Sequence, residues 1–233
     1  GKPHSYIFKW YFFGYLFIAI SWGMGSSLQI YMNTYFWEFK SIMLASYLGI
    51  YVLSTLSAYL IVPRLVEVIE KKTILLIAIS FAALIPPIPI ILFINNLLPD
   101  TGTWNLFYAT IPFVYVANTC LSSSAIIRES MLGDISDEVE LESGIGQQGL
   151  MFASSSLIGK LNTGLGILMA GITLEFINFP QGTDVTPTAE NIFNLAIVQG
   201  PLVAILMIIP FGIFSLYKID RYRHQQILAK LNH

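Results

Sequence analysis

Charged residues are scarce in this sequence. Asp, Glu, Lys and Arg make up 11% of the 233 residues, and the net charge is −2. A soluble domain carries about 25% charged residues, so this chain in water would expose too much apolar surface and would aggregate. The net charge near zero and the lack of a strongly basic patch argue against nucleic acid as a partner. The single cysteine, Cys120, excludes an intramolecular disulfide framework.

Groups for catalysis are also missing from the apolar part of the chain. The three histidines, His4, His224 and His233, lie near the ends of the sequence. None of the long apolar stretches described below contains an aspartate, so neither a histidine base nor an aspartyl pair is available within them. The motifs H-E-x-x-H and G-x-x-x-x-G-K-[ST] are absent as well. We therefore expect that the protein is neither an enzyme nor an ATP-driven pump, and that it holds no metal ion and no resident cofactor.

Apolar residues are abundant and are grouped in six long stretches. They make up 55% of the chain, and the mean hydropathy is +0.68. Each stretch is near or above the length of about 20 residues with which a helix crosses hydrocarbon. The stretches are continuous, whereas a barrel strand alternates apolar and polar residues. The sequence therefore predicts an all-α membrane protein, a single bundle of six transmembrane helices in the lipid bilayer. The predicted spans are residues 10–36, 42–62, 73–97, 104–127, 147–176 and 192–217.

Lysine and arginine are distributed unequally between the two sides. If the first span leaves the cytoplasm, the external loops hold Lys40 alone. Because positive residues collect in cytoplasmic segments, we expect both termini in the cytoplasm and the protein in the plasma (inner) membrane. The first span is too long for a cleavable signal peptide. The cytoplasmic positive residues are Lys2, Lys9, Arg64, Lys71, Lys72, Arg128, Lys218, Arg221, Arg223 and Lys230.

Polar residues within the spans follow helical spacing. They are costly in hydrocarbon and therefore face a cavity or another helix, although a serine or threonine can also bond the preceding turn of its own helix. Such stripes occur in the first, fourth and fifth spans and, more weakly, in the second, which we expect to face a pore. The third and sixth spans are predicted to face lipid. The candidates for contact with a small polar solute are Trp22, Gln29, Asn33, Tyr115, Asn118, Gln148, Ser156 and Lys160.

Lys160 is the most unusual of these candidates. It lies about thirteen residues after Gln147 in the fifth span, too deep to extend comfortably to either membrane surface. A charged ammonium at that depth needs a carboxylate or a water-filled cavity. No Asp or Glu lies at comparable depth in the predicted spans, since Glu142 and Glu175 flank opposite ends of the same helix. We expect the counter-charge to be water, a solute or an acid elsewhere in a longer protein.

The segment of residues 128–142 is predicted to be an acidic cytoplasmic loop. Its acids have helical spacing and lie near basic residues of neighbouring loops, which suggests a charge network that opens and closes with gating, or simply a solvated face. The proposed network consists of Asp134, Asp137, Glu138, Arg128, Lys71 and Lys72.

At this segment the chain resembles a known family. Residues 134–140 read D-I-S-D-E-V-E, and residues 143–149 read S-G-I-G-Q-Q-G. They are similar to the D-x-x-D-(Y/E)-x-E and T-G-x-R-x-E-G motifs of the glycoside–pentoside–hexuronide:cation symporters, the melibiose-carrier-like branch of the major facilitator superfamily. Further likeness lies in K-L-N-T-G-L-G at 160–166, Ala170-Gly171, Phe179-Pro180, Lys71-Lys72 and the tail from Tyr217 to His224.

The resemblance implies helices 7–12 of a twelve-helix carrier that moves a small polar solute, such as a sugar, by alternating access. Coupling would be to Na⁺ or H⁺, with the coupling carboxylates in the amino-terminal half, and Lys160 would lie near the sugar and cation sites. Because the chain begins at Gly1 rather than Met, we expect it to be part of a longer protein. The family's arginine and glutamate fall near Gly146 and Gln148, which places the usual solute in doubt. A stand-alone six-helix scaffold or a homodimeric carrier without sugar specificity remains the alternative.

Overall fold

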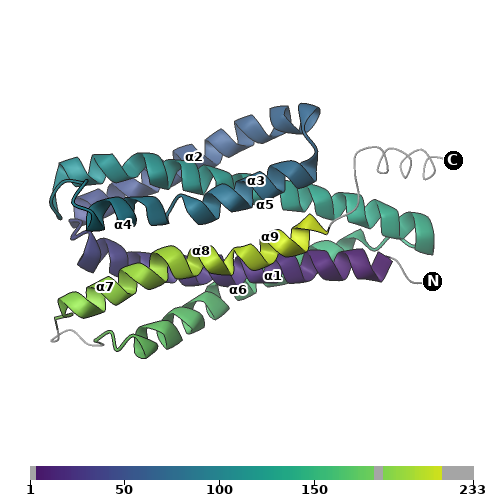
Figure 1. The fold of residues 1–233 in the computed structure, drawn as a ribbon. Coiled ribbons are helices and arrows are strands. Elements are labelled where there is room, and N and C mark those ends of the chain that lie inside the picture. The colour runs from purple at the N-terminus through teal and green to yellow at the C-terminus, as the bar shows by residue number, and fades with distance from the viewer. Residues whose placement is uncertain (1–3, 181–185, 217–233) are drawn as a thin grey trace.

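The computed structural model describes residues 4–180 and 186–216, and its six long helices confirm the predicted all-α membrane fold (Figure 1). All six are long and apolar enough to cross a bilayer. The helical segments are α1 (His4–Tyr31), η1 (Met32–Phe36), α2 (Ser41–Val68), α3 (Lys71–Leu84), α4 (Pro87–Ile94), α5 (Trp104–Ser143), α6 (Gln148–Phe176), α7 (Ala189–Ile197), η2 (Val198–Leu202), α8 (Val203–Leu206) and α9 (Ile208–Ser215). The tail motif from Tyr217 to His224, Lys2 and the basic residues Lys218, Arg221, Arg223 and Lys230 lie outside the described residues.

Several helix ends differ from the predicted boundaries. The acidic segment 128–142 is not a loop, because α5 continues through it as far as Ser143, where Gly144 ends the helix with a φ of 67°. The third span is divided into α3 and α4 at Ile85 and Pro86. The sixth span changes to the wider π-helix at η2, which contains Pro201. Proline lacks the N–H that a regular helix requires, so a break or a bulge is the expected response.

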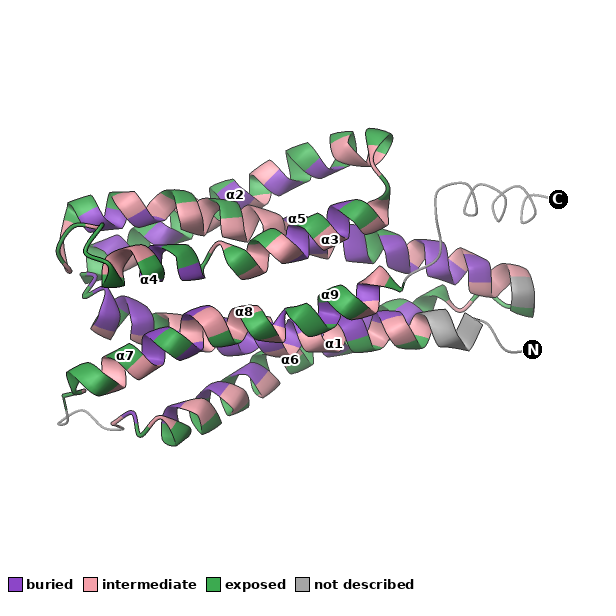
Figure 2. Ribbon diagram, in the orientation of Figure 1, coloured by how far each residue is buried: buried purple, intermediate pink, exposed green. Residues whose placement is uncertain are grey.

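The six spans form two layers of three. α1 packs against α6 and α9 in one layer, and α5 packs against α2 and α3 in the other (Figure 1). The amino-terminus lies at the same end as the α2–α3 and α5–α6 turns. Half of the most apolar stretch of α1 is buried, against 22% for α2 and α6, so α1 is the central helix. The exposed residues of α2 and α6 (Figure 2) are mostly large and apolar, as suits contact with lipid or with other helices.

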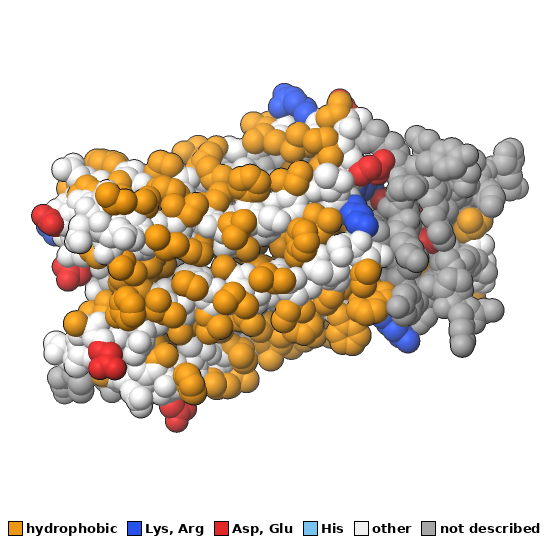
Figure 3. All heavy atoms as spheres, in the orientation of Figure 1, with side chains coloured by type: hydrophobic (Ala, Val, Ile, Leu, Met, Phe, Trp, Pro, Cys, Tyr) orange, Lys and Arg blue, Asp and Glu red, His pale blue; other side chains and the backbone are white. Residues whose placement is uncertain are grey.

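The buried core has two parts, one at each end of the bundle. One part, at the end of η1, gathers aromatic residues around Trp37, Phe39 and Phe107 and is called the aromatic core cluster below. The other part, toward the α5–α6 turn, gathers Ile127, Met131 and other residues where α5 meets α1, α3 and α6. Charged side chains lie toward the two ends, and the face between them is covered by apolar groups (Figure 3).

Candidate solute site

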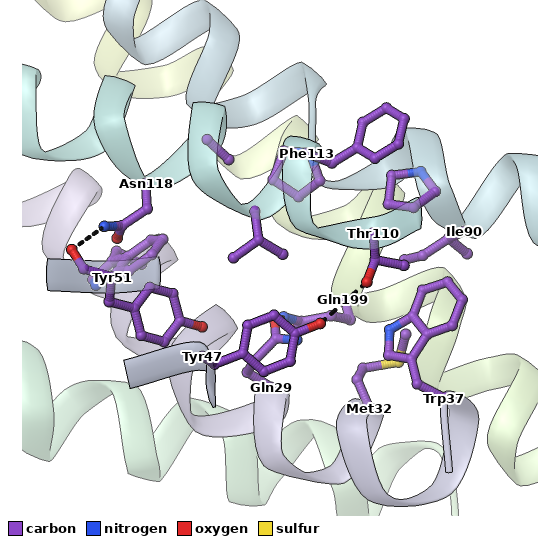
Figure 4. Close-up of a pocket in the computed structure, with 15 residues that line it drawn as sticks. Gln29, Met32, Trp37, Tyr47, Tyr51, Ile90, Thr110, Phe113, Asn118 and Gln199 are labelled. Atoms are coloured by element: carbon purple, nitrogen blue, oxygen red, sulfur yellow. Dashed lines mark hydrogen bonds between the residues drawn. The ribbon is translucent and has the colours of Figure 1, made fainter. Parts of the chain in front are cut away.

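A polar cavity lies between the two layers, next to the aromatic core cluster. Its volume is about 100 Å³, which is room for a few water molecules. Known ligand pockets are larger, at roughly 300–1,000 Å³, so a bound solute requires a wider state. The lining residues are Trp22, Gln29, Met32, Trp37, Tyr47, Tyr51, Pro86, Pro89, Ile90, Thr110, Phe113, Val114, Ala117, Asn118 and Gln199 (Figure 4).

One wall of the cavity carries a chain of amide groups. Gln199 Nε2 donates to Gln29 Oε1 at 3.0 Å and to the Gly25 carbonyl at 2.9 Å. Gln29 Nε2 in turn donates to Asn33 Oδ1 at 2.9 Å. The Oε1 atom of Gln199 is buried and has no hydrogen-bond partner among the described residues. A buried acceptor without a donor is energetically unfavourable. The Oε1 atom of Gln199 can therefore accept a hydrogen bond from a hydroxyl or amide group that enters the cavity.

The opposite wall is formed by α2 and α5, whose polar groups are largely paired with each other. Tyr47 Oη and Thr110 Oγ1 lie 3.3 Å apart, and Thr110 also donates to the Phe107 carbonyl. Asn118 Nδ2 bonds Ser54 Oγ on α2. These groups hold the wall in place, and the cavity carries no charged side chain among its lining residues (Figure 4).

Three interruptions of helix geometry border the same cavity. Met32 opens the π-helix η1, Gln199 lies in the π-helix η2, and Pro86 marks the break between α3 and α4. π-helical segments are rare and are frequent at functional sites. At the η1 end of the cavity, Trp37 packs against Phe36 and Phe93 at ring-centre distances of 4.6 and 5.5 Å, which closes that end with aromatic rings.

The structure brings part of the predicted solute face together. Trp22, Gln29 and Asn118 line the cavity. Asn33 is buried and reaches it through its bond to Gln29. Tyr115 instead bonds Ser57 of α2 and does not line the cavity.

The other predicted contacts lie apart from the cavity, on α6. Gln148, Ser156 and Lys160 are exposed, and no residue of α6 is among those that line it. The buried face of α6, with Ser155 and Gly166, turns toward α1. The exposed face with Lys160 therefore points out of this six-helix bundle.

The division of the spans also differs from the prediction based on polar stripes. The third span contributes Pro86, Pro89 and Ile90 to the cavity, and the sixth contributes Gln199. Both spans had been assigned to lipid because they carry few polar groups. The sequence does contain one indication that the sixth span meets a cavity. Gln199 is an amide within an apolar run and next to Gly-Pro, and such a group is costly in lipid unless it is hydrogen-bonded or faces a cavity.

The proposed charge network has an ion pair at its centre. Lys71 Nζ lies 2.7 Å from Asp134 Oδ1 and links α3 to α5. Lys72 and Asp137 lie at the same end, and Glu138 is buried there. Arg128 is directed elsewhere, with its guanidinium carbon 4.4 Å above the ring of Tyr15.

Glu129 was overlooked because the fourth span was predicted to end at residue 127. In the structure it continues the helix, and Glu129 Oε1 accepts a hydrogen bond from Ser155 Oγ of α6 at 2.8 Å. Among the described residues, no group of three His, Cys, Asp or Glu side chains is placed to hold a metal ion.

The fold and the cavity define a membrane protein of several spans with a polar site inside an apolar bundle. A protein family described as MFS/sugar transport protein matches residues 5–221 of the chain. The chain therefore belongs to this family of the major facilitator superfamily, and it is a membrane transport protein. No curated protein matches the chain.

Proposed function

We propose that the chain is one six-helix half of a cation-coupled symporter that moves a small, uncharged, hydroxyl-bearing solute such as a sugar. The observation that carries this proposal is the buried Oε1 of Gln199, which has no hydrogen-bond partner among the described residues and lies beside the amide of Gln29 in the cavity. A solute hydroxyl can donate to Gln199 Oε1 and accept from the N–H of Gln29 Nε2 that does not bond Asn33. Because no lining residue is charged, the cavity favours a neutral solute over an ionised one.

Lys160 supports the presence of a second half. Its ammonium is exposed in the middle of α6, a helix long enough to span the bilayer. Such a charge requires water or a carboxylate, which a water-filled cleft between two halves supplies. In this arrangement the amino-terminal half provides the carboxylates that bind Na⁺ or H⁺, and binding alternates between the two sides of the membrane.

The distribution of basic residues supports an orientation with both termini in the cytoplasm of a plasma membrane. Arg64, Lys71, Lys72 and Arg128 lie toward the end that holds the amino-terminus, and Lys40 lies at the other end. A tag on either terminus is expected to be accessible only from the cytoplasmic side. Detection of a tag from outside intact cells contradicts this orientation.

The decisive experiment is solute uptake by the full-length protein in vesicles, with Na⁺ and pH gradients imposed separately. We expect accumulation of a neutral sugar with one of the two gradients. The Gln29→Leu variant should lose uptake, while Asn105→Leu, an exposed amide on α5, should retain it. Failure of the unmodified protein to take up any of a panel of neutral sugars contradicts the proposal.

The role of Lys160 is tested in the same vesicles. Lys160→Ala should abolish accumulation or make it independent of the cation gradient, because the charge beside the cleft is gone. Lys40→Ala, which removes a lysine from an exposed outer loop, is the matched control. If Lys160→Ala still accumulates solute in proportion to the gradient, Lys160 has no part in coupling.

A further inference from the structure

Two neighbouring residues of α5 make polar contacts across the layers near the cytoplasmic end. Arg128 reaches α1, where its guanidinium carbon lies 4.4 Å from the centre of the Tyr15 ring. Glu129 reaches α6, where its carboxylate accepts the Ser155 hydroxyl at 2.8 Å. Consecutive residues of a helix project about 100° apart, so a single turn of α5 contacts both long helices of the other layer. We refer to Arg128, Glu129, Tyr15 and Ser155 as the clasp.

The clasp contains a buried charge that is only partly satisfied. Arg128 is 6% exposed, and its one hydrogen bond among the described residues is from Nη1 to Ser124 Oγ of its own helix, at 3.1 Å. Its Nε atom is buried and has no partner in the described part of the chain. The guanidinium thus rests mainly on the face of an aromatic ring. Such a contact has no fixed partner atoms, so it can be broken and remade more readily than a buried ion pair.

Several other polar contacts lie within one layer, and the contacts of Thr101 with Glu38 and of Gly102 with Trp37 cross between the layers at the opposite end of the bundle. Lys71 and Asp134 join α3 to α5. Asn118 joins α5 to α2, and Gln199 joins η2 to α1. An opening between the layers at the clasp end therefore leaves these bonds in place but must break the clasp.

The clasp lies on the cytoplasmic side of the cavity. Arg128 follows Asn118, a lining residue, by ten positions of α5, which is about 15 Å along the helix axis. The aromatic residues around Trp37 close the other side. A solute held between the layers is thus enclosed by rings on the outer side and by the clasp on the inner side.

We propose that the clasp is the cytoplasmic gate of the cavity, with Arg128 and Glu129 as positioning residues that hold α5 against α1 and α6 until solute is released inward. This inference rests on the proposed function, since it concerns the same cavity. It adds a moving part within one half of the carrier, distinct from movement between the halves.

The first test locks the clasp in the full-length protein. Glu129→Cys and Ser155→Cys are combined and joined by a short bis-methanethiosulfonate reagent, which a reductant removes. We expect cross-linking to abolish uptake and reduction to restore it, while the reagent leaves either single variant active. Normal uptake by fully cross-linked protein overturns the gate. If the unmodified carrier takes up no solute at all, it is the proposed function that fails.

The second test measures opening without requiring transport. Ala117 lines the cavity and is replaced by Cys in a Cys120→Ser background, and its reaction with a membrane-impermeant maleimide is followed from the cytoplasmic side. Glu129→Gln and Arg128→Gln should each raise the labelling rate several-fold. Glu175→Gln, a charge loss at the outer end of α6, should leave it unchanged. Equal rates in all variants, with unchanged size-exclusion profiles, overturn the proposal.

Discussion

The two closest pairs of helices are held together by different means. Where α1 crosses α6, Gly23 and Gly166 bring the two backbones into direct contact, so that a Cβ atom on Gly166 would collide with the Gly23 backbone. Between α2 and α5, hydroxyl and amide groups bond across the interface, as in Ser54 with Asn118 and Thr55 with Ser122. In lipid, helices gain no hydrophobic attraction for each other, and close packing and polar bonds take its place. This six-helix bundle uses close backbone packing at the α1–α6 interface and polar bonds at the α2–α5 interface.

The contrast has a consequence for tolerance to mutation. Close packing fails when a side chain is added, because the atom it meets is backbone and cannot move aside. A set of polar bonds fails gradually, because each bond in a membrane interior is worth about 0.6 kcal/mol on average. The α1–α6 interface should therefore be sensitive to increases in size and the α2–α5 interface to losses of polarity.

The largest effect is expected for Gly166→Leu. The added side chain has to separate α1 from α6, which we expect to cost about 3 kcal/mol of folding free energy or to prevent assembly altogether. Size-exclusion profiles and thermal unfolding of the purified protein measure the loss. Gly212→Ala in α9, where no neighbouring atom lies within 4 Å of a Cβ, should be neutral or slightly stabilising. Equal stability of the Gly166→Leu protein would contradict close packing at this crossing.

A smaller effect is expected for Asn118→Ala. The change removes the bond to Ser54 and the weaker contact with the Tyr51 carbonyl at 3.4 Å. We expect a loss of about 1–2 kcal/mol, because the buried Ser54 oxygen loses its donor, whereas the Tyr51 carbonyl still accepts from Ser54 Oγ at 2.9 Å. Reversible unfolding in mixed micelles gives the value, and Asn105→Ala, at an exposed position of the same helix, should show little change. A loss as large as that of Gly166→Leu would mean that the two interfaces do not differ as described.

The smallest effect is expected for Thr55→Val. The variant keeps the shape of the side chain and removes one bond, to Ser122 at 3.2 Å. Destabilisation of about 0.6 kcal/mol follows from the average for such bonds. The same unfolding assay applies, with the reciprocal variant Ser122→Ala and the double variant completing a cycle. A coupling free energy near zero would show that this bond contributes nothing.

The spans themselves could be predicted from the sequence, because continuous apolar length is a local property. The end of the fourth span could not be placed, since α5 continues through residues that are as polar as a loop. Its burial against α1 and α3, through Met131 and Ile135, depends on partners far away in the sequence.

The cavity was predicted only in part, for a similar reason. Helical spacing located Gln29 and Asn118, which lie on stripes of polar residues. It missed Gln199, which is isolated in an apolar span and gains its role from η2 and from Gln29 across the interface. It also placed Tyr115 with the solute, whereas that hydroxyl bonds Ser57. A stripe indicates that a face avoids lipid but not whether it meets a helix or a cavity.

The length of α5 has a mechanical consequence. Its 40 residues make a rod of about 60 Å, twice the thickness of the hydrocarbon layer, which is about 30 Å. A tilt of roughly 10° about its amino-terminal end at Trp104 sweeps the acidic end through about 10 Å. A slight shift of the wall that carries Thr110 and Asn118 is thus amplified into a large displacement of Asp134 and its neighbours on the far side of the membrane.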